Sequence, residues 1–326
     1  MESSIVDGAS SIAAGAGPSK SVARKRLVVF LAFTFVLTWG LDFVACTMFG
    51  SFEKGESATP AIVVPIAVSM FFPLAGAFVA NLACGKENRL DLGLRPQIKG
   101  SVRYYLAAWF VPALVSLLGV ALFFALNPQL FDSTFAHYLD SMKASMDAAG
   151  ASAIGNMPTD QELVDMAPMI VAATVIAALT YAPFLNAISA FGEEVGWRSM
   201  LFPTLCELMP TRIAVIVSGV IWGLWHAPII AIGHNYGMDY PGFPWVGILV
   251  MIVACTTLGA CLCYLRVRTQ SIWPCALAHG AVNAIANIGV VFCTVGQTLA
   301  GPSSLGYIAG IPLFALGVVC LLKIGD

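Results

Sequence analysis

Long runs of apolar residues, separated by short polar connections, fill most of the chain. A transmembrane helix needs about 20 consecutive, mainly apolar residues. Eight runs approach or exceed this length, and they cover residues 27–49, 60–84, 104–126, 166–190, 213–233, 244–265, 272–295 and 304–322. The pattern therefore predicts an all-α fold, a polytopic membrane helix bundle with about eight transmembrane helices.

Composition supports a membrane protein. Only 10% of the 326 residues are charged and 59% are hydrophobic, whereas a soluble domain carries about 25% charged residues. This excludes a soluble globular enzyme. The net charge of −2 provides no basic surface for a phosphate backbone, so we expect no nucleic-acid partner. We expect a multi-pass integral protein, in the cell membrane, with the lipid bilayer around it; the oligomeric state stays open.

The distribution of lysine and arginine predicts an orientation. With eight spans and a cytoplasmic N-terminus, 14 of the 16 Lys and Arg residues fall in cytoplasmic segments. Only Lys54 and Lys143 fall on the outer side. Cytoplasmic connections of membrane proteins carry an excess of these residues. We therefore expect both termini to be cytoplasmic.

The acidic connection at residues 127–165 is long, and it has room for a short amphipathic helix. Thr159 and Glu162 have the spacing of a capping box, which predicts that the next helix begins near residue 160. Pro183 lies well inside the apolar run that follows, where proline kinks or breaks a helix. We expect a second helical piece, from 184 through Arg198, at an angle to the first.

The first polar motif is Glu193-Glu194, followed by Trp197 and Arg198. Ionisable residues at membrane depth are candidates for function. On a helix, Glu194 and Arg198 share a face, as do Glu193 and Trp197. One carboxylate would be neutralised by the arginine, which leaves Glu193 to act as a general base. Taken alone, the motif fits equally well two interfacial glutamates that extend toward water.

The second polar motif is Trp222 with His226, which lie one helical turn apart in the fifth apolar run. The indole can pack against the imidazole at this spacing. Pro228 weakens the helix just beyond, so local carbonyls can accept hydrogen bonds from the ring. Taken alone, a histidine that packs between helices explains the motif as well.

The third polar motif is His279 with Asn283 in the seventh run, again one turn apart on one helix face. Both side chains donate hydrogen bonds, so together they can form an oxyanion hole. Gly280 and Ala281 allow another backbone to approach closely. Hydrogen bonding between helices without chemistry is the alternative.

The three motifs together are more informative than each alone. Isolated buried ionisable groups are costly, so convergence on one cavity is the economical explanation. One difficulty is that Glu193 falls near the cytoplasmic face while His226 falls deep in its span. We expect the kink at Pro183 to return the second helical piece to the bundle.

The motifs resemble those of the CPBP family of intramembrane proteases, also called the CAAX protease and bacteriocin-processing (ABI) family. The family pattern is E-E-x-x-x-R, an aromatic residue followed by x-x-x-H, and H-x-x-x-N. Here the order and spacings match, with Ser199 where glycine is expected and Trp222 where phenylalanine is commonest. The similarity covers about 160–295, under half of the chain.

The resemblance implies a glutamate-dependent endopeptidase with its site inside the bilayer. By that resemblance Glu193 and His226 activate a water, and His279 and Asn283 stabilise the oxyanion. Glu194 and Arg198 orient the site, with Trp222 in support. The expected substrate is a membrane-associated or lipidated peptide, of which a prenylated CAAX-type C-terminus is the best-defined class.

The resemblance also raises the question of a metal, because some accounts of the family include one. Glu193, Glu194, His226 and His279 could supply ligands for zinc. The H-E-x-x-H pattern is absent, and none of the nine cysteines forms a C-x-x-C pair. We favour a site without a cofactor, keep zinc as the alternative, and expect the cysteines to be buried apolar residues.

Four regions follow from this interpretation. They are a disordered cytoplasmic tail (1–26), membrane helices with the acidic outer loop (27–159), a catalytic CPBP-like core (160–295) and a C-terminal membrane helix (296–326). The alternative is a non-catalytic membrane scaffold or immunity protein, or a proton-coupled transporter that uses the same Glu and His residues. Inverted repeats would favour transport, and we find none in the sequence.

Overall fold

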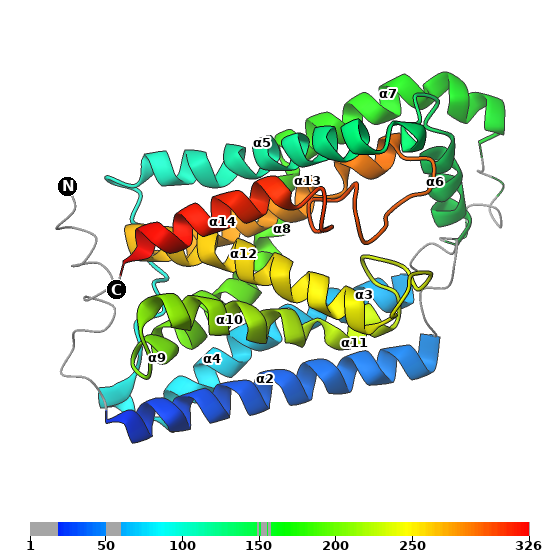
Figure 1. The fold of residues 1–326 in the computed structure, drawn as a ribbon. Helices are drawn as coiled ribbons and strands as arrows, with labels where there is room; N and C mark the ends of the chain where they lie inside the picture. Colours follow the sequence, from blue (N-terminus) through cyan, green and yellow to red (C-terminus); the bar gives the residue numbers. More distant parts are fainter. Residues whose placement is uncertain (1–18, 50–59, 149, 151–154, 156–157, 326) are drawn as a thin grey trace.

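The computed structural model describes residues 19–49, 60–148, 150, 155 and 158–325. Apart from one isolated bridge between Phe131 and Cys293, the regular structure in these ranges is helical (Figure 1). The predicted tail up to residue 18 and Lys54 lie outside the described residues. The prediction of an all-α bundle is confirmed.

The longer helices are α2 (Lys20–Phe49), α3 (Pro60–Ser69), α4 (Phe72–Ala83), α5 (Val102–Leu126), α6 (Ala136–Ala148), α7 (Asp160–Leu179), α8 (Ala182–Gly196), α10 (Thr211–Trp225), α12 (Trp245–Thr269), α13 (Trp273–Ile285) and α14 (Ile311–Ile324). The short helices α9 (Phe202–Cys206) and α11 (Ala227–Ala231) follow α8 and α10. A π-helical turn, Trp197–Leu201, joins α8 to α9.

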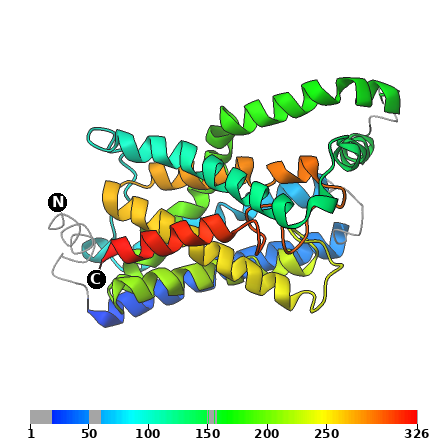
Figure 2. The same ribbon diagram turned by 45° about the horizontal axis from the view of Figure 1, so that its top comes forward.

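Six helical segments are long and apolar enough to cross a membrane: Lys20–Met48, Val64–Ala83, Val102–Leu126, Asp160–Leu179, Trp245–Thr269 and Trp273–Phe292. With the two shorter apolar helices Thr211–Trp225 and Ile311–Ile324, the described residues contain about the eight candidate spans that the sequence predicts. The chain is thus an integral, multi-pass membrane protein. The start of α2 and the end of α14 lie at the same end of the bundle (Figures 1 and 2), as an even number of crossings requires.

Helix α2 begins at Lys20, before the predicted start at residue 27, so residues 20–26 are helical and not part of a tail. Arg26 explains the difference, because it forms a buried ion pair with Glu207, 2.8 Å apart. Its second guanidinium nitrogen donates to the carbonyl of Asn88. These contacts hold the first turns of the helix against the bundle.

The predicted capping box at α7 is confirmed. Thr159 accepts from the backbone N–H of Glu162, whose carboxylate accepts from the backbone N–H of Thr159. The predicted break is also present, because α7 ends at Leu179 and α8 begins with Pro183 in its first turn. Figure 2 shows α7 running out to the edge of the bundle, with α8 inside it.

The fifth and eighth runs end or start elsewhere than predicted. The fifth is divided, because α10 ends at Trp225 and α11 begins with Pro228 in its first turn. The last helix begins at Ile311, not at residue 304. Gly301 and Pro302 precede it, and Gly301 has φ +149°, a backbone conformation that residues with a side chain rarely adopt.

Close backbone packing positions the helices that carry the motifs. Helix α8 packs along α13, and α10 packs along α12. A Cβ on Gly280 would lie 2.5 Å from both the nitrogen of Ala187 and the carbonyl oxygen of Pro183. A Cβ on Gly219 would lie 2.3 Å from the Cα of Thr256. Small residues that let helix backbones approach are typical of membrane bundles, and the prediction for Gly280 is confirmed.

Candidate active site

The Glu193 carboxylate lies between two indoles. Its Oε2 accepts hydrogen bonds from Trp197 Nε1 at 3.2 Å and from Trp222 Nε1 at 2.7 Å. The side chain is only 2% exposed. Tryptophan is a donor only, so both contacts orient the carboxylate without neutralising it. The expected pairing with Trp197 is present, and the contact with Trp222 is an addition that the sequence did not indicate.

Glu194 forms a second, separate network. Its Oε1 lies 3.2 Å from an Arg198 nitrogen and 2.9 Å from His279 Nδ1. Glu194 and Arg198 are 0% and 1% exposed, and the predicted pair is therefore fully buried. The Arg198 guanidinium also lies over the Trp222 ring, 4.1 Å from its centroid. A buried charge pair needs such additional contacts to offset its desolvation.

His226 sits at the break between α10 and α11. Its backbone N–H donates to Gly223, three residues back, which leaves the Trp222 carbonyl for the imidazole: His226 Nδ1 lies 2.9 Å from it. A carbonyl only accepts, so Nδ1 carries the proton and Nε2 is the basic nitrogen. The expectation that a local carbonyl bonds the ring is confirmed.

One cavity of about 300 Å³ is lined by all four residues assigned to catalysis, Glu193, His226, His279 and Asn283. The supporting residue Trp222 lines it as well, while Glu194 and Arg198 lie behind it. Glu193 and His226 thus border the same cavity, as the expected return of the second helical piece to the bundle requires. The indole of Trp222, one turn before His226, reaches across to Glu193.

Four further polar residues line this cavity that the sequence interpretation did not include: Asn186, His234, Asn235 and Asn287. Helical spacing could have identified two of them, because Asn186 precedes Glu193 by two turns and Asn287 follows Asn283 by one turn. His234 and Asn235 lie between helices, where no periodicity applies. Burial lowers the pKa of His234 to about 4.

The candidate zinc ligands Glu193, His226 and His279 share the cavity but do not form a ligand cluster. In the described part of the chain, no three His, Cys, Asp or Glu side chains are arranged to hold a metal ion. Nδ1 of each histidine contacts a hydrogen-bond acceptor, an arrangement that metal-binding histidines share. Cys255 lines the same cavity, with its sulfur 3.7 Å from His226 Nδ1. Because the described residues form no ligand cluster, the mechanism proposed below uses protein groups alone, and zinc stays the alternative.

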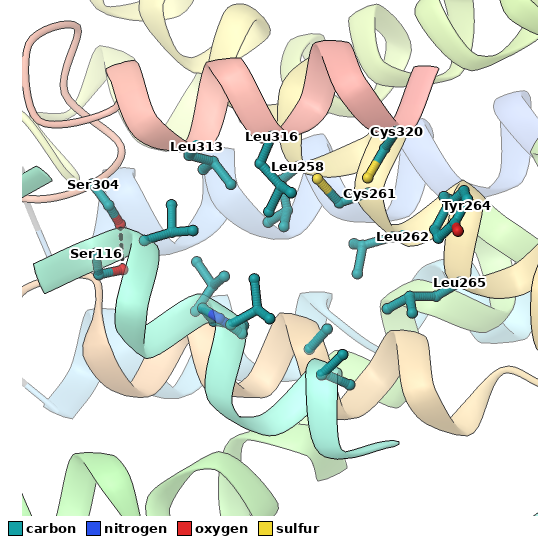
Figure 3. Close-up of a pocket in the computed structure, with 17 residues that line it drawn as sticks. Ser116, Leu258, Cys261, Leu262, Tyr264, Leu265, Ser304, Leu313, Leu316 and Cys320 are labelled. Atoms are coloured by element: carbon teal, nitrogen blue, oxygen red, sulfur yellow. Dashed lines mark hydrogen bonds between the residues drawn. The ribbon is translucent and has the colours of Figure 1, made fainter. Parts of the chain in front are cut away.

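A second, smaller cavity adjoins the first. It has a volume of about 110 Å³, lies among α5, α12, α13 and α14, and is lined almost wholly by apolar atoms (Figure 3). Ser116 and Ser304 form its polar edge, with their hydroxyls 3.2 Å apart. Leu258 and Val282 line both cavities. The polar cavity and the apolar cavity thus share two lining side chains.

Comparisons with known proteins agree with the motifs. Residues 166–285 match the family described as type II CAAX prenyl endopeptidase Rce1-like. A stretch of 53 residues is 38% identical to the CAAX prenyl protease 2 of Methanococcus maripaludis. That stretch covers 16% of this chain and 20% of the relative, so the chain matches about a fifth of that protein's length. All three motifs fall within 166–285, and the resemblance to the CPBP family is confirmed there.

Proposed function

We propose, from the premise that residues 166–285 are an Rce1-like segment, that the chain is an intramembrane endopeptidase. The observation that carries the proposal is the convergence of Glu193, His226, His279 and Asn283 on one cavity. The substrate would be a membrane-associated protein or peptide, with a prenylated CAAX-type C-terminus as the class to test first.

In this proposal Glu193 and His226 act on one water molecule. The two indoles occupy Oε2 of Glu193, so Oε1 is the oxygen that would accept a proton from water. His226 Nε2 would accept a hydrogen bond from the same water, because its Nδ1 is held by the Trp222 carbonyl. A base within hydrogen-bond reach of a water molecule raises the nucleophilicity of that water at neutral pH.

Attack of that water on a peptide carbonyl would form a C–O bond and place negative charge on the carbonyl oxygen. The Asn283 amide and His279 Nε2 would donate hydrogen bonds to this oxyanion. His279 donates from Nε2 only when both ring nitrogens carry protons, and the Glu194 carboxylate at Nδ1 is a counterion for that form. The proton taken by Glu193 would pass to the leaving amine as the C–N bond breaks.

The apolar cavity supports a lipid-bearing substrate. It shares Leu258 and Val282 with the polar cavity, so an apolar group attached near the scissile bond would lie close to it. Burial of each methylene group contributes about 0.8 kcal/mol. A lipidated peptide would therefore bind more tightly than the same peptide without its lipid.

The test is cleavage by purified protein in detergent, detected by mass spectrometry. A farnesylated CAAX-type peptide and its unmodified counterpart are each incubated with wild type and with Glu193→Gln, with and without a chelator. We expect the wild type to cut the farnesylated peptide in both chelator arms, and the variant to cut neither peptide. Equal cleavage by wild type and variant would contradict the proposal, and loss with the chelator would contradict the metal-free mechanism.

A further inference from the structure

Helix α2 carries a buried stripe that the proposed chemistry does not use. Arg26, Phe30, Thr34, Thr38 and Asp42 follow each other at intervals of four residues, and all are at most 4% exposed. Four of these five side chains are polar, on a helix that is otherwise apolar enough to span a membrane. Polar side chains inside such a helix hold neighbouring helices in place or take part in function. This helix lies outside the Rce1-like residues 166–285.

One turn of this helix contacts Trp225, the neighbour of His226. The Trp225 indole Nε1 donates to Thr38 Oγ1 at 2.9 Å. The Trp39 indole Nε1 donates to the Trp225 carbonyl at 3.2 Å. Trp225 is thus held from α2 through both its side chain and its backbone. Its ring lies edge-on to the His226 imidazole, with the centroids 4.8 Å apart.

These contacts coincide with the break between α10 and α11. The last carbonyls of a helix lack partners within the helix. Here the Trp222 carbonyl accepts from His226 Nδ1, and the Trp225 carbonyl accepts from Trp39. Helix α2 therefore supplies one of the hydrogen bonds that satisfy the free carbonyls at this break.

The same helix also supports the residues around Glu193. Phe30 lies edge-on to the Trp197 ring, with centroids 5.6 Å apart. Trp197 contacts Trp225 at 5.7 Å and donates to Glu193. One face of α2 therefore touches the two tryptophans that adjoin the proposed water-activating pair.

We propose that Thr38 and Trp39 of α2 are positioning residues of the active site, which hold His226 in place through Trp225. The proposal rests on the function proposed above, and it extends the site beyond the Rce1-like segment. Thr38 contributes the acceptor for the indole, and Trp39 contributes the donor for the carbonyl. Neither residue lines the cavity.

The chain offers a matched control one turn away. Among the described residues, the Thr34 hydroxyl has no hydrogen-bond partner, although it is fully buried. Thr34→Val and Thr38→Val therefore make the same chemical change on the same face of the same helix. Only Thr38→Val removes a hydrogen bond. The variant Thr38→Ser keeps the hydroxyl that accepts it.

The first measurement is independent of activity. Hydrogen–deuterium exchange of the full chain in detergent is followed in peptides that cover residues 222–232. We expect Thr38→Val to speed exchange there about tenfold, while Thr34→Val and Thr38→Ser stay within about twofold of wild type. Equal exchange in Thr38→Val and Thr34→Val would overturn the proposal.

The second measurement is cleavage of the farnesylated peptide by the same variants. We expect Thr38→Val to lower kcat about tenfold with KM within about twofold, because a misplaced base weakens the chemical step more than binding. We expect Thr38→Ser to recover the wild-type kcat. Faster exchange with an unchanged kcat would overturn the link to His226. A wild type that cleaves nothing would count against the proposed function. The exchange result would still show whether α2 stabilises the segment at the break between α10 and α11.

Discussion

His279 Nδ1 lies 2.9 Å from Glu194 Oε1, and this carboxylate oxygen is also the partner of Arg198. The two residues are 85 positions apart in the chain and lie on α13 and α8. The carboxylate therefore links the third motif to the first. It stabilises a charged or donating imidazole on one side and a buried guanidinium on the other.

Replacement of Glu194 should destabilise the fold. Glu194→Gln leaves Arg198 buried without a counterion, and breaking a buried ion pair costs about 3–5 kcal/mol. We expect a clear fall in the thermal unfolding midpoint in detergent, together with loss of cleavage. The matched variant Glu193→Gln removes a carboxylate held by neutral indoles, so its midpoint should stay near that of wild type. Equal midpoints for the two variants would contradict this assignment of the two glutamates.

The two indoles on Glu193 should act together. Trp222→Phe and Trp197→Phe each remove one donor to Oε2, and each should lower kcat about tenfold, since a hydrogen bond to a charged group contributes about 1.5–3 kcal/mol. The double variant should deviate from the product of the single effects, because both bonds end on one oxygen. A double-mutant cycle of kcat measures this coupling. Strict multiplicativity would show that the two indoles act independently.

The sequence predicts the contacts of the site that join residues one helical turn apart. The pairs Glu194–Arg198, Glu193–Trp197 and Trp222–His226 are each one helical turn apart, and all three contacts are present. The period of the helix dictates such pairs.

Contacts between helices could not be predicted in this way. Trp222 donates to Glu193 across 29 residues, and this contact depends on how α8 packs beside α10. The sequence therefore indicated Trp197 as a partner of Glu193 but not Trp222. The contacts of Trp225 with α2 span 186 and 187 residues, and no motif indicates them.

The close approach of α8 and α13 should not tolerate a methyl group. Gly280→Ala would place a Cβ 2.5 Å from backbone atoms of α8, and overpacking of this kind costs about 1–3 kcal/mol. We expect a lower unfolding midpoint and weaker cleavage, because α8 carries Glu193 and α13 carries His279. Gly40→Ala is the control, since nothing lies within 4 Å of its Cβ position. Similar midpoints for the two variants would contradict the packing described for Gly280.

The pH dependence of stability should contain a contribution from His234. Burial lowers the pKa of His234 from 6.5 to about 4, so the folded chain keeps this ring neutral where the unfolded chain binds a proton. Its contribution to stability is therefore complete above pH 6.5 and falls as the pH drops toward 4.

His234→Asn removes that titration. Because the side chain is partly exposed, we expect the variant to reduce the loss of unfolding free energy between pH 7 and pH 5 by only about 1 kcal/mol. Denaturant unfolding of both proteins at the two pH values measures this difference. An identical pH dependence in wild type and variant would show that burial does not perturb this histidine.

The central claim is that Glu193 and His226 activate the same water molecule. Single-turnover cleavage of the farnesylated peptide by Glu193→Gln, His226→Asn and the double variant tests it most directly. We expect each single variant to lose at least about 10³-fold in rate and the double variant to be scarcely slower, because residues that act as a unit are not additive. A single variant that cleaves at the wild-type rate, or a double variant whose loss is the product of the two, would contradict the claim.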